Sequence, residues 1–192
     1  SEDFQTNRGT GAEYTSNSFF GRLLYSYANR YLFQANVRRD GSSRFAKNYR
    51  WGTFPSFSAG WVMSEEPFMQ KANLPWLSYL KLRASWGKLG NERIGSNYFP
   101  YIAWMNFGST LFYMADGSVV SGSTARPAVL AVEDITWETT TSTDLGFDAN
   151  FLNNRLHINF DYYWKKTTDM LLAIQIPYTM GYNSPNTNAG KM

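Results

Sequence analysis

Residues 143–165 read TDLGFDANFLNNRLHINFDYYWK, and apolar and polar side chains alternate along both halves of this segment. Alternation with a period of two is the pattern of a β-strand whose two faces meet different surroundings. A two-residue turn at Asn153-Asn154 joins the halves as a hairpin. The register that this turn imposes sets Phe147 opposite Phe160, so that every apolar side chain of the hairpin lies on one face and the other face is polar.

Four other segments alternate in the same way. They are Phe19–Tyr27, Tyr31–Arg39, Thr53–Met63 and Tyr79–Leu89. Three residues, 28–30, connect the first two of these segments, and an odd number keeps both apolar sets on one face. A soluble sheet can also have one apolar face, but long strands with aromatic residues on one side and polar residues on the other are typical of an outer-membrane barrel wall. The sequence therefore predicts an all-β fold, a six-stranded antiparallel segment of a transmembrane β-barrel.

The composition agrees with such a wall. The chain has 192 residues, of which 18% are aromatic, and no apolar run long enough for a membrane-spanning helix. Its mean hydropathy of −0.41 is negative, as expected where strands turn only every second side chain to lipid. The net charge of +3 comes from scattered basic residues and gives no indication of nucleic-acid binding. The absence of cysteine excludes disulfides and thiol chemistry.

We expect the chain to be an internal piece of a longer polypeptide. It begins at Ser1 without a signal peptide, although a secreted barrel needs one. Six strands also cannot close a barrel, since outer-membrane barrels have roughly eight strands or more, and an open edge in lipid leaves backbone groups unpaired. The missing strands must come from the rest of the polypeptide or from further copies of the chain.

The connections between strands fall into two groups. The predicted periplasmic group is 28–30, 64–78 and 152–154, and the predicted extracellular group is 40–52 and 90–138. Outer-membrane barrels have short periplasmic turns and long external loops, which decides this assignment. Within the periplasmic group, Ser64-Glu65-Glu66-Pro67 predicts a short helix with Ser64 as N-cap and an acidic first turn. In the longest loop, a small hairpin is predicted around Ala115-Asp116-Gly117.

Several blocks of the sequence closely resemble the SusC/RagA family of TonB-dependent transporters. They are RYL at 30–32, VRRDGSSRF at 37–45, WGTFPS at 51–56, GW at 60–61, SEEPF at 64–68, LKLRAS at 80–85, GN at 90–91, DYY at 161–163, KTTDML at 166–171, GY at 181–182 and NAGKM at 188–192. These blocks follow the family's order and cover most of residues 18–192. Only the stretch from about 94 to 132 departs from the pattern, and this loop is variable in the family.

The resemblance implies that residues 1–192 are part of one TonB-dependent receptor β-barrel domain of about 22 strands, with an N-terminal plug domain outside this chain. It implies a location in the outer membrane of a Gram-negative, Bacteroidetes-like cell and an opening step driven through TonB, which acts on the plug region. It also implies a SusD-like surface lipoprotein as partner, contact with outer-membrane lipid, and a glycan or peptide nutrient as substrate. An enzyme activity, a cofactor and a nucleic-acid partner are not implied.

Charged and polar residues on the predicted inner face are candidates for guiding a hydrated substrate. They are Arg38, Lys81, Arg83, Asp144, Asp148, His157 and Asp161. Lumen charges more commonly hydrogen-bond to the plug and to one another, and kinship of fold does not locate a binding site. Contact with substrate and pairing within the barrel therefore stand as two interpretations of the same residues.

Aromatic residues in the longest loop are candidates for contact with the substrate or with the lipoprotein lid. They are Tyr98, Tyr101, Trp104, Phe107, Phe112 and Tyr113. Aromatic rings stack on sugar rings, but they also pack within loops and are enriched at protein interfaces. We expect deletion of 94–132 to change substrate or lid binding and to leave the barrel assembled, because loops lie outside the membrane-spanning ladder.

Other motifs give no catalytic or metal site. Two Ser-x-x-Lys patterns, at 78–81 and 85–88, lie on a predicted strand without the partner motifs of penicillin-binding enzymes. His157 is the only histidine and has no cysteine partners for zinc. Asp144 and Asp148 share a face but are about 13 Å apart along the strand, so they do not by themselves form a glycosidase pair.

Two other functions stay open on the sequence alone. One is a soluble carbohydrate-binding β-sandwich, in which the face with Leu145 and Phe160 would pack against a second sheet. The other is a non-transporting outer-membrane barrel or adhesin, which would lack the plug.

Overall fold

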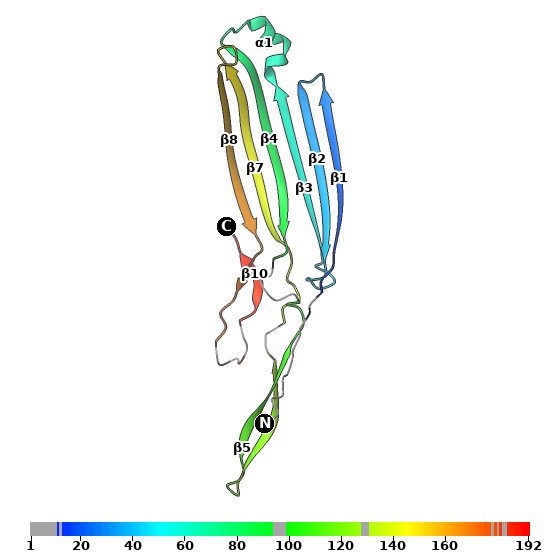
Figure 1. Cartoon of the computed structure of the whole chain (residues 1–192), viewed down its shortest axis with the longest axis vertical. Helices are drawn as coiled ribbons and strands as arrows, with labels where there is room; N and C mark the ends of the chain where they lie inside the picture. The colour runs from blue at the N-terminus through cyan, green and yellow to red at the C-terminus, as the bar shows by residue number, and fades with distance from the viewer. Residues whose placement is uncertain are drawn as a thin grey trace, which may run out of the picture.

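The computed structural model describes residues 11, 13–93, 99–127, 131–177, 179, 181 and 184–192. Its main feature is a single antiparallel sheet of six strands in the order β1-β2-β3-β4-β7-β8 (Figure 1). The strands are β1 (Ser16–Tyr27), β2 (Tyr31–Ser42), β3 (Trp51–Val62), β4 (Leu77–Asn91), β7 (Glu138–Phe151) and β8 (Leu156–Thr168). Each strand pairs antiparallel with the strand of this sheet that precedes it along the chain, as the alternating segments predicted. The prediction of an all-β antiparallel fold is confirmed.

The hairpin of β7 and β8 has the predicted register but a different turn. Phe147 pairs with Phe160, and their rings stack with centroids 5.6 Å apart. The ladder ends at Phe151 and Leu156, so the pair of Leu152 with Arg155 that a two-residue turn requires is not formed. The Leu152 amide donates instead to the Trp76 carbonyl at 3.0 Å, and of the predicted pair only the bond from the Arg155 amide to the Leu152 carbonyl is present, at 3.3 Å.

Residues 152–154 therefore form a wider turn than predicted. All three have positive φ, between 53° and 65°, and the Arg155 amide donates to the Phe151 carbonyl at 3.1 Å. Asparagine tolerates this left-handed region better than most residues, which explains the Asn-Asn pair at the tip of the turn. The three-residue turn between β1 and β2 is confirmed, because Tyr27 pairs with Tyr31 and the apolar sets of both strands share a face.

The two faces of the sheet separate side chains as predicted. The apolar face is uncovered: Leu145 is 48% exposed, Phe160 is 53% exposed and Tyr162 is 62% exposed. In the part of the chain that the structure describes, no second sheet packs against it, so the β-sandwich alternative is not supported. Among the same residues, no helix is long and apolar enough to cross a membrane.

Aromatic side chains lie along the whole apolar face and stack at both of its ends. Phe19 stacks on Trp51 at one end, with centroids 6.0 Å apart, and Trp61 packs on Phe68 at the other, at 6.5 Å. Trp51 and Trp61 are both in β3, and the ten residues between their positions span about 33 Å along the strand. For a strand tilted by about 40°, that length corresponds to roughly 25 Å along the barrel axis, the height of the apolar band of outer-membrane barrels.

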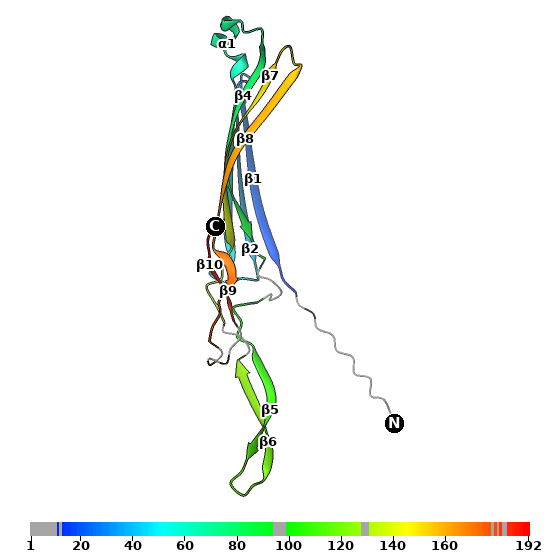
Figure 2. The same ribbon diagram turned by 90° about the vertical axis from the view of Figure 1, so that its left-hand side faces the viewer.

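The short connections gather at one end of the sheet and the long ones at the other (Figures 1 and 2). One end carries η1 (Met63–Glu65), α1 (Pro67–Ala72) and the turns at 28–30 and 152–155, and we call it the helix end. The opposite end carries the hairpin of β5 (Met105–Tyr113) and β6 (Val119–Pro127), and we call it the hairpin end. The predicted hairpin around Ala115-Asp116-Gly117 is confirmed and is longer than expected.

A second small sheet, of β9 (Met170–Ala173) and β10 (Asn186–Gly190), was not predicted. The Asn188 side chain joins it to the segment that leads into β7, because its Oδ1 accepts from the Thr136 amide at 2.9 Å and its Nδ2 donates to the Thr136 carbonyl at 3.0 Å. The same Nδ2 donates to the Asp169 carbonyl at 2.6 Å. The backbone ladder of this sheet is short and shows no alternating pattern, which is why the sequence did not indicate it.

The predicted helix exists, but its predicted cap is wrong. The helix α1 starts at Pro67, with Glu66 as the N-cap residue, and Ser64 lies one turn earlier in η1. No side chain caps the helix. Glu66 is directed elsewhere, since its Oε1 accepts from Trp61 Nε1 at 3.1 Å. Proline at the first position needs no partner for a missing N–H, which lowers the need for a cap.

Candidate functional site

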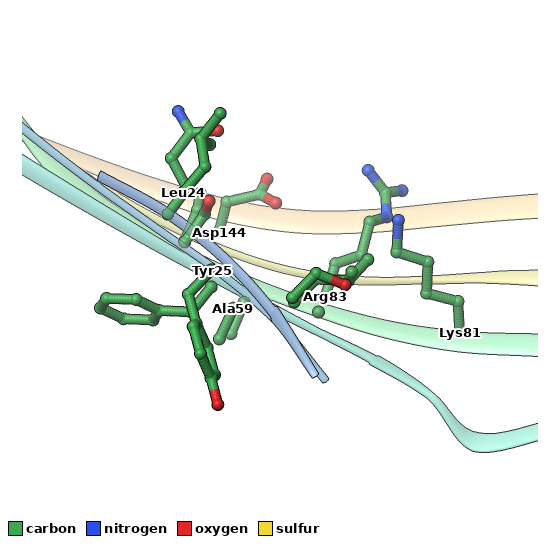
Figure 3. Close-up of a pocket in the computed structure, with 14 residues that line it drawn as sticks. Leu24, Tyr25, Ala59, Lys81, Arg83 and Asp144 are labelled. Carbon is green, nitrogen blue, oxygen red and sulfur yellow. The ribbon is translucent and has the colours of Figure 1, made fainter. Parts of the chain in front are cut away.

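A hollow of about 510 Å³ lies at the middle of the sheet, where β2, β3, β4 and β7 bring polar side chains together. Figure 3 shows Lys81, Arg83 and Asp144 on one side of the sheet and Tyr25 and Ala59 on the other. The polar side of the hollow is completed by four neutral side chains, Ser26, Gln34, Ser58 and Ser85. Strand alternation therefore brings three of the predicted lumen residues into one place.

Arg83 binds two carboxylates across neighbouring strands. Its Nη2 lies 3.0 Å from Asp148 Oδ1 on β7 and 3.0 Å from Asp161 Oδ1 on β8. The direct partner of Arg83 in the ladder is Gly146, which in turn pairs with Asp161. A Cβ atom at Gly146 would overlap the Asp161 carboxylate. Glycine is thus required for the guanidinium to reach across β7.

Lys81 and Asp144 face the same hollow with free charges. Among the residues that the structure describes, neither has a hydrogen-bond or ion-pair partner. Arg83 is held by its two carboxylates through Nη2, whereas these two groups of opposite sign remain open to a solute. The predicted lumen residues near the hollow thus fall into two groups. Arg83 pairs with Asp148 and Asp161, whereas Lys81 and Asp144 do not pair.

Two predicted lumen residues lie away from the hollow. Arg38 is at the hairpin end, where its Nε donates to Asp40 at 2.8 Å and where it lines a separate hollow of about 300 Å³. His157 is at the helix end, where its Nδ1 lies 2.8 Å from Asn150 Oδ1. Within the described ranges, no group of His, Cys, Asp or Glu side chains is arranged to hold a metal ion.

The sequence did not indicate the main packed cluster of the molecule. Phe45, Phe54, Ile135 and Trp137 are buried together at the hairpin end, with exposures of 9% or less. The Phe54 and Trp137 rings meet edge to face at 5.4 Å, and Trp137 Nε1 donates to the Arg50 carbonyl at 3.1 Å. One signal was available: Phe54 is apolar but falls on the polar phase of its strand.

The aromatic residues predicted for the longest loop do not form one surface. Tyr101 packs inward and its hydroxyl donates to the Ser43 carbonyl at 3.4 Å. On the β5–β6 hairpin, the register puts Phe107 and Tyr113 on one face, both more than 80% exposed, and Phe112 on the other, over Gly122. Trp104 is 53% exposed before the hairpin. Tyr98 lies outside the described residues.

A buried carboxylate joins the β1–β2 turn, the strands β2 and β3, and the β3–β4 connection at the helix end. Glu66 is 7% exposed and accepts from Trp61 Nε1 at 3.1 Å and from Arg30 Nη1 at 3.2 Å. The Tyr31 hydroxyl also donates to it, and this bond, followed by those from Trp61 and Arg30, holds the pKa of Glu66 below its ordinary value. The sequence suggested only a helix start at this position.

Comparison with known proteins identifies the sheet. Residues 2–192 match the model of the family described as TonB dependent receptor-like, beta-barrel. The chain belongs to this family. It is 42% identical to the TonB-dependent receptor SusC of Bacteroides thetaiotaomicron, in an alignment of 184 positions that covers 91% of this chain and 17% of SusC. It is 39% identical to the TonB-dependent receptor P39 of Formosa agariphila, over 95% of this chain and 17% of that receptor.

Solved structures agree with this assignment. The chain matches the structure of the RagAB peptide transporter with a TM-score of 0.75 and 30% identity, over 94% of this chain and 19% of the matched one. The RagAB peptide importer in its closed-closed state matches with the same TM-score and 32% identity. The chain therefore spans about a fifth or less of the relatives it matches. The resemblance to SusC/RagA transporters is confirmed.

Membership of this TonB-dependent receptor family gives each face of the sheet its surroundings. The apolar face with its two aromatic groups is the outside of the barrel wall, and the polar face with Arg83, Lys81 and Asp144 is the inside. The fold prediction, a segment of a transmembrane β-barrel, is confirmed. Among the described residues, no strand pairs with the outer sides of β1 and β8, and β8 bonds there only to Met192, whose amide and carbonyl pair with those of Thr167 at 2.9 Å.

Proposed function

We propose that the parent protein is a TonB-dependent importer in the outer membrane of a Gram-negative, Bacteroidetes-like cell, and that this chain is part of its barrel wall. Kinship supports this proposal: SusC and P39 are both named TonB-dependent receptors, and the matched RagAB structures are described as a peptide transporter and importer. The barrel of about 22 strands, the plug and the action of TonB on the plug belong to the same proposal.

The arrangement of the connections orients the wall. Outer-membrane barrels place short turns in the periplasm and long loops outside the cell. The helix end, with its turns at 28–30 and 152–155, is then periplasmic, and the hairpin end is extracellular. The packed cluster around Phe54 and Trp137 lies in this view at the external rim, where it holds the bases of the long loops together.

The observation that carries the proposed transport is the pair of free charges in the central hollow. Lys81 and Asp144 offer a cation and an anion, and Gln34, Ser58 and Ser85 offer neutral donors and acceptors around them. A hydrated solute with hydroxyl, amide or charged groups can exchange water for these partners at small cost. A glycan or a peptide nutrient has such groups, whereas an apolar solute does not.

The charges that pair within the wall serve a different role in this proposal. Arg83, Asp148 and Asp161 hold three strands together on the lumen side and present a fixed polar surface to the plug. Exposed ion pairs add little stability, so the value of this network lies in the fixed positions of its charges.

The hairpin β5–β6 is the proposed contact of the receptor with a SusD-like surface lipoprotein. Phe107 and Tyr113 are exposed on one of its faces, and large exposed aromatic side chains are typical of protein interfaces. Trp104 and Phe112 have the same proposed role, while Tyr101 serves the packing of the loop.

The test is uptake by the full-length receptor in a strain that lacks other copies. We expect Lys81→Gln combined with Asp144→Asn to reduce uptake of the nutrient, glycan or peptide, by about tenfold through a higher KM, because hydrogen bonds to charged groups contribute about 1.5–3 kcal/mol. Lys71→Gln, on the exposed side of α1, removes one charge outside the lumen and serves as control. Loss of uptake on disruption of TonB is also expected.

Two results would contradict the proposal at different levels. Normal uptake by the double variant, at normal surface abundance, would show that the central charges do not meet the solute. If growth on every glycan and peptide source needed neither the receptor nor TonB, the proposed import would be excluded. Parallel binding assays with oligosaccharides and with short peptides separate the two substrate classes.

A further inference from the structure

The charged residues on the outside of the wall are all basic and lie toward the hairpin end. They are Arg39 on β2, Lys88 on β4 and Lys166 on β8. In the six described strands, no Asp or Glu shares this face, whereas the inner face carries both signs. A charge that faces hydrocarbon is costly, so basic residues confined to one end of the outer face mark the boundary of the apolar band.

The register brings two of these residues into one row. Lys88 pairs with Thr141, and Thr141 pairs with Lys166 on its other side. Neighbouring strands are about 4.8 Å apart, so the Cα atoms of the two lysines are about 10 Å apart with a threonine between them. All three side chains leave the sheet on the same face.

The adjacent row toward the middle of the sheet holds two tryptophans at the same strand positions. Trp86 pairs with Thr143, which pairs with Trp164. The two rows are about 6.6 Å apart along the strands. Tryptophan at a membrane–water interface lies at the level of the lipid headgroups, so the lysine row lies at headgroup level or just beyond it.

The lysines of this row have no partner within the wall. Lys88 and Lys166 are exposed, and no ion pair, hydrogen bond or ring contact involves either one in the part of the chain that the structure describes. The adjacent Lys165, which faces inward, differs because its Nζ lies 5.2 Å from the centre of the Tyr163 ring. Arg39, in β2, lies 5.4 Å from the centre of the Trp51 ring.

We propose that Lys88, Thr141 and Lys166 form a binding site for the phosphate group of an anionic lipid in the extracellular leaflet. The inference rests on the proposed outer-membrane location and on the orientation of the wall. Two ammonium groups and one hydroxyl supply donors from three strands to the phosphate oxygens, and lysine is a common phosphate ligand. Trp86 and Trp164 pack beside the lipid below its headgroup. The absence of acidic residues on this face provides the charge complementarity.

The test is lipid binding by the purified full-length receptor in neutral detergent, measured by native mass spectrometry with diphosphorylated lipid A as probe. Each lysine near an anionic lipid surface contributes about a fivefold change in affinity, so we expect Lys88→Gln combined with Lys166→Gln to weaken binding by about 25-fold. Lys165→Gln removes the adjacent lysine from the opposite face and should leave binding unchanged. Lys88→Arg combined with Lys166→Arg should keep most of the affinity.

Several outcomes would overturn the proposal. Equal losses for Lys166→Gln and Lys165→Gln would mean that net charge and not this row attracts the lipid. Equal binding of lipid A after removal of its phosphates would exclude phosphate recognition. Full displacement of the lipid by excess inorganic phosphate would assign the row to free anions. Uptake of nutrient by the same variants is measured separately and should stay normal, so failure here is distinct from failure of the proposed transport.

Discussion

Gly146 shows how one residue without a side chain organises the polar face. It stands between Arg83 and Asp161 in the ladder, and the guanidinium crosses above it to reach both carboxylates. Any Cβ atom at this position would also lie 2.7 Å from the Phe160 carbonyl oxygen, which belongs to the backbone and cannot move easily. The requirement for glycine here comes from close approach and not from a turn.

We expect Gly146→Ala to destabilise the folded barrel by about 1–3 kcal/mol, the usual cost of an added methyl group in a site without room. The matched control is Gly21→Ala in β1, where the new Cβ atom would meet Val37 at an ordinary 3.6 Å. Unfolding of the full-length receptor by denaturant in lipid vesicles measures both variants. Equal stability of the two would mean that Asp161 and Arg83 move aside without loss.

Glu66 links stability to pH at the helix end. Because its pKa in the folded state is lowered by donors from Tyr31, Trp61 and Arg30, its ionised form is favoured by folding. The resulting contribution to stability is present above the pKa of the unfolded chain and is lost as the pH falls through the folded pKa. Glu66→Gln should therefore be less stable than the natural chain at neutral pH, and the difference should vanish in acid. Glu65→Gln is the control, and an unfolding profile in which both variants behave alike would contradict the assignment.

At the scale of elements, the strands could be predicted and the connections only in part. A wall between lipid and water imposes alternation along each strand, so residues such as Phe147 and Phe160 reveal their pairing in the sequence. The sheet β9–β10 and the cluster of Phe45 and Trp137 have no such constraint, because loop packing follows no period. The central site was predicted as residues but not as a group, since the pairing of Arg83 with two carboxylates depends on Gly146.

The two faces give a direct test of the wall at adjacent positions in β8. Phe160 lies on the apolar face near the middle of the strand, and Asn159 lies on the polar face. We expect Phe160→Arg to cost about 2–4 kcal/mol of membrane stability, because arginine at the bilayer midplane must be desolvated, and Asn159→Arg to be tolerated far better. Folding of the full-length receptor into lipid vesicles measures the difference. Equal sensitivity would mean that neither face of β8 meets lipid.

At the scale of the whole molecule, the six-stranded sheet depends on its surroundings to cover its faces and edges. Both faces of the sheet are largely exposed, and the edges at β1 and β8 present unpaired backbone groups, which an apolar membrane does not tolerate. The main packed cluster of the described residues lies at the hairpin end, around Phe54 and Trp137, and Val62 and Glu66 are buried at the helix end. The membrane therefore covers the apolar face, the neighbouring strands of the barrel pair with the edges, and the packed cluster stabilises the hairpin end.

Because the packed cluster and the β5–β6 hairpin are separate parts of the hairpin end, the structure predicts which part of the long loop can be removed. Val132 packs against the cluster, and Tyr101 donates to the Ser43 carbonyl, so deletion of 94–132 in full would also remove packing that supports the rim. Replacement of Met105–Pro127 by a short Gly-Ser linker removes the hairpin β5–β6 alone. We expect this variant to assemble a normal barrel, because none of these residues belongs to the six-stranded ladder, and to lose binding of the lipoprotein or of the substrate.

The contrasting variant is Trp137→Ala, which removes the centre of the cluster and should cost about 3–5 kcal/mol, as for other buried aromatic side chains. The barrel of Trp137→Ala should be less stable than the barrel that lacks the hairpin, although Trp137→Ala changes one residue and the deletion removes a whole hairpin. Heat-modifiable migration in detergent reports barrel assembly, and co-purification of the surface lipoprotein reports lid binding. If the hairpin deletion failed to assemble while Trp137→Ala folded normally, the rim of the barrel would depend on the hairpin and not on the buried cluster.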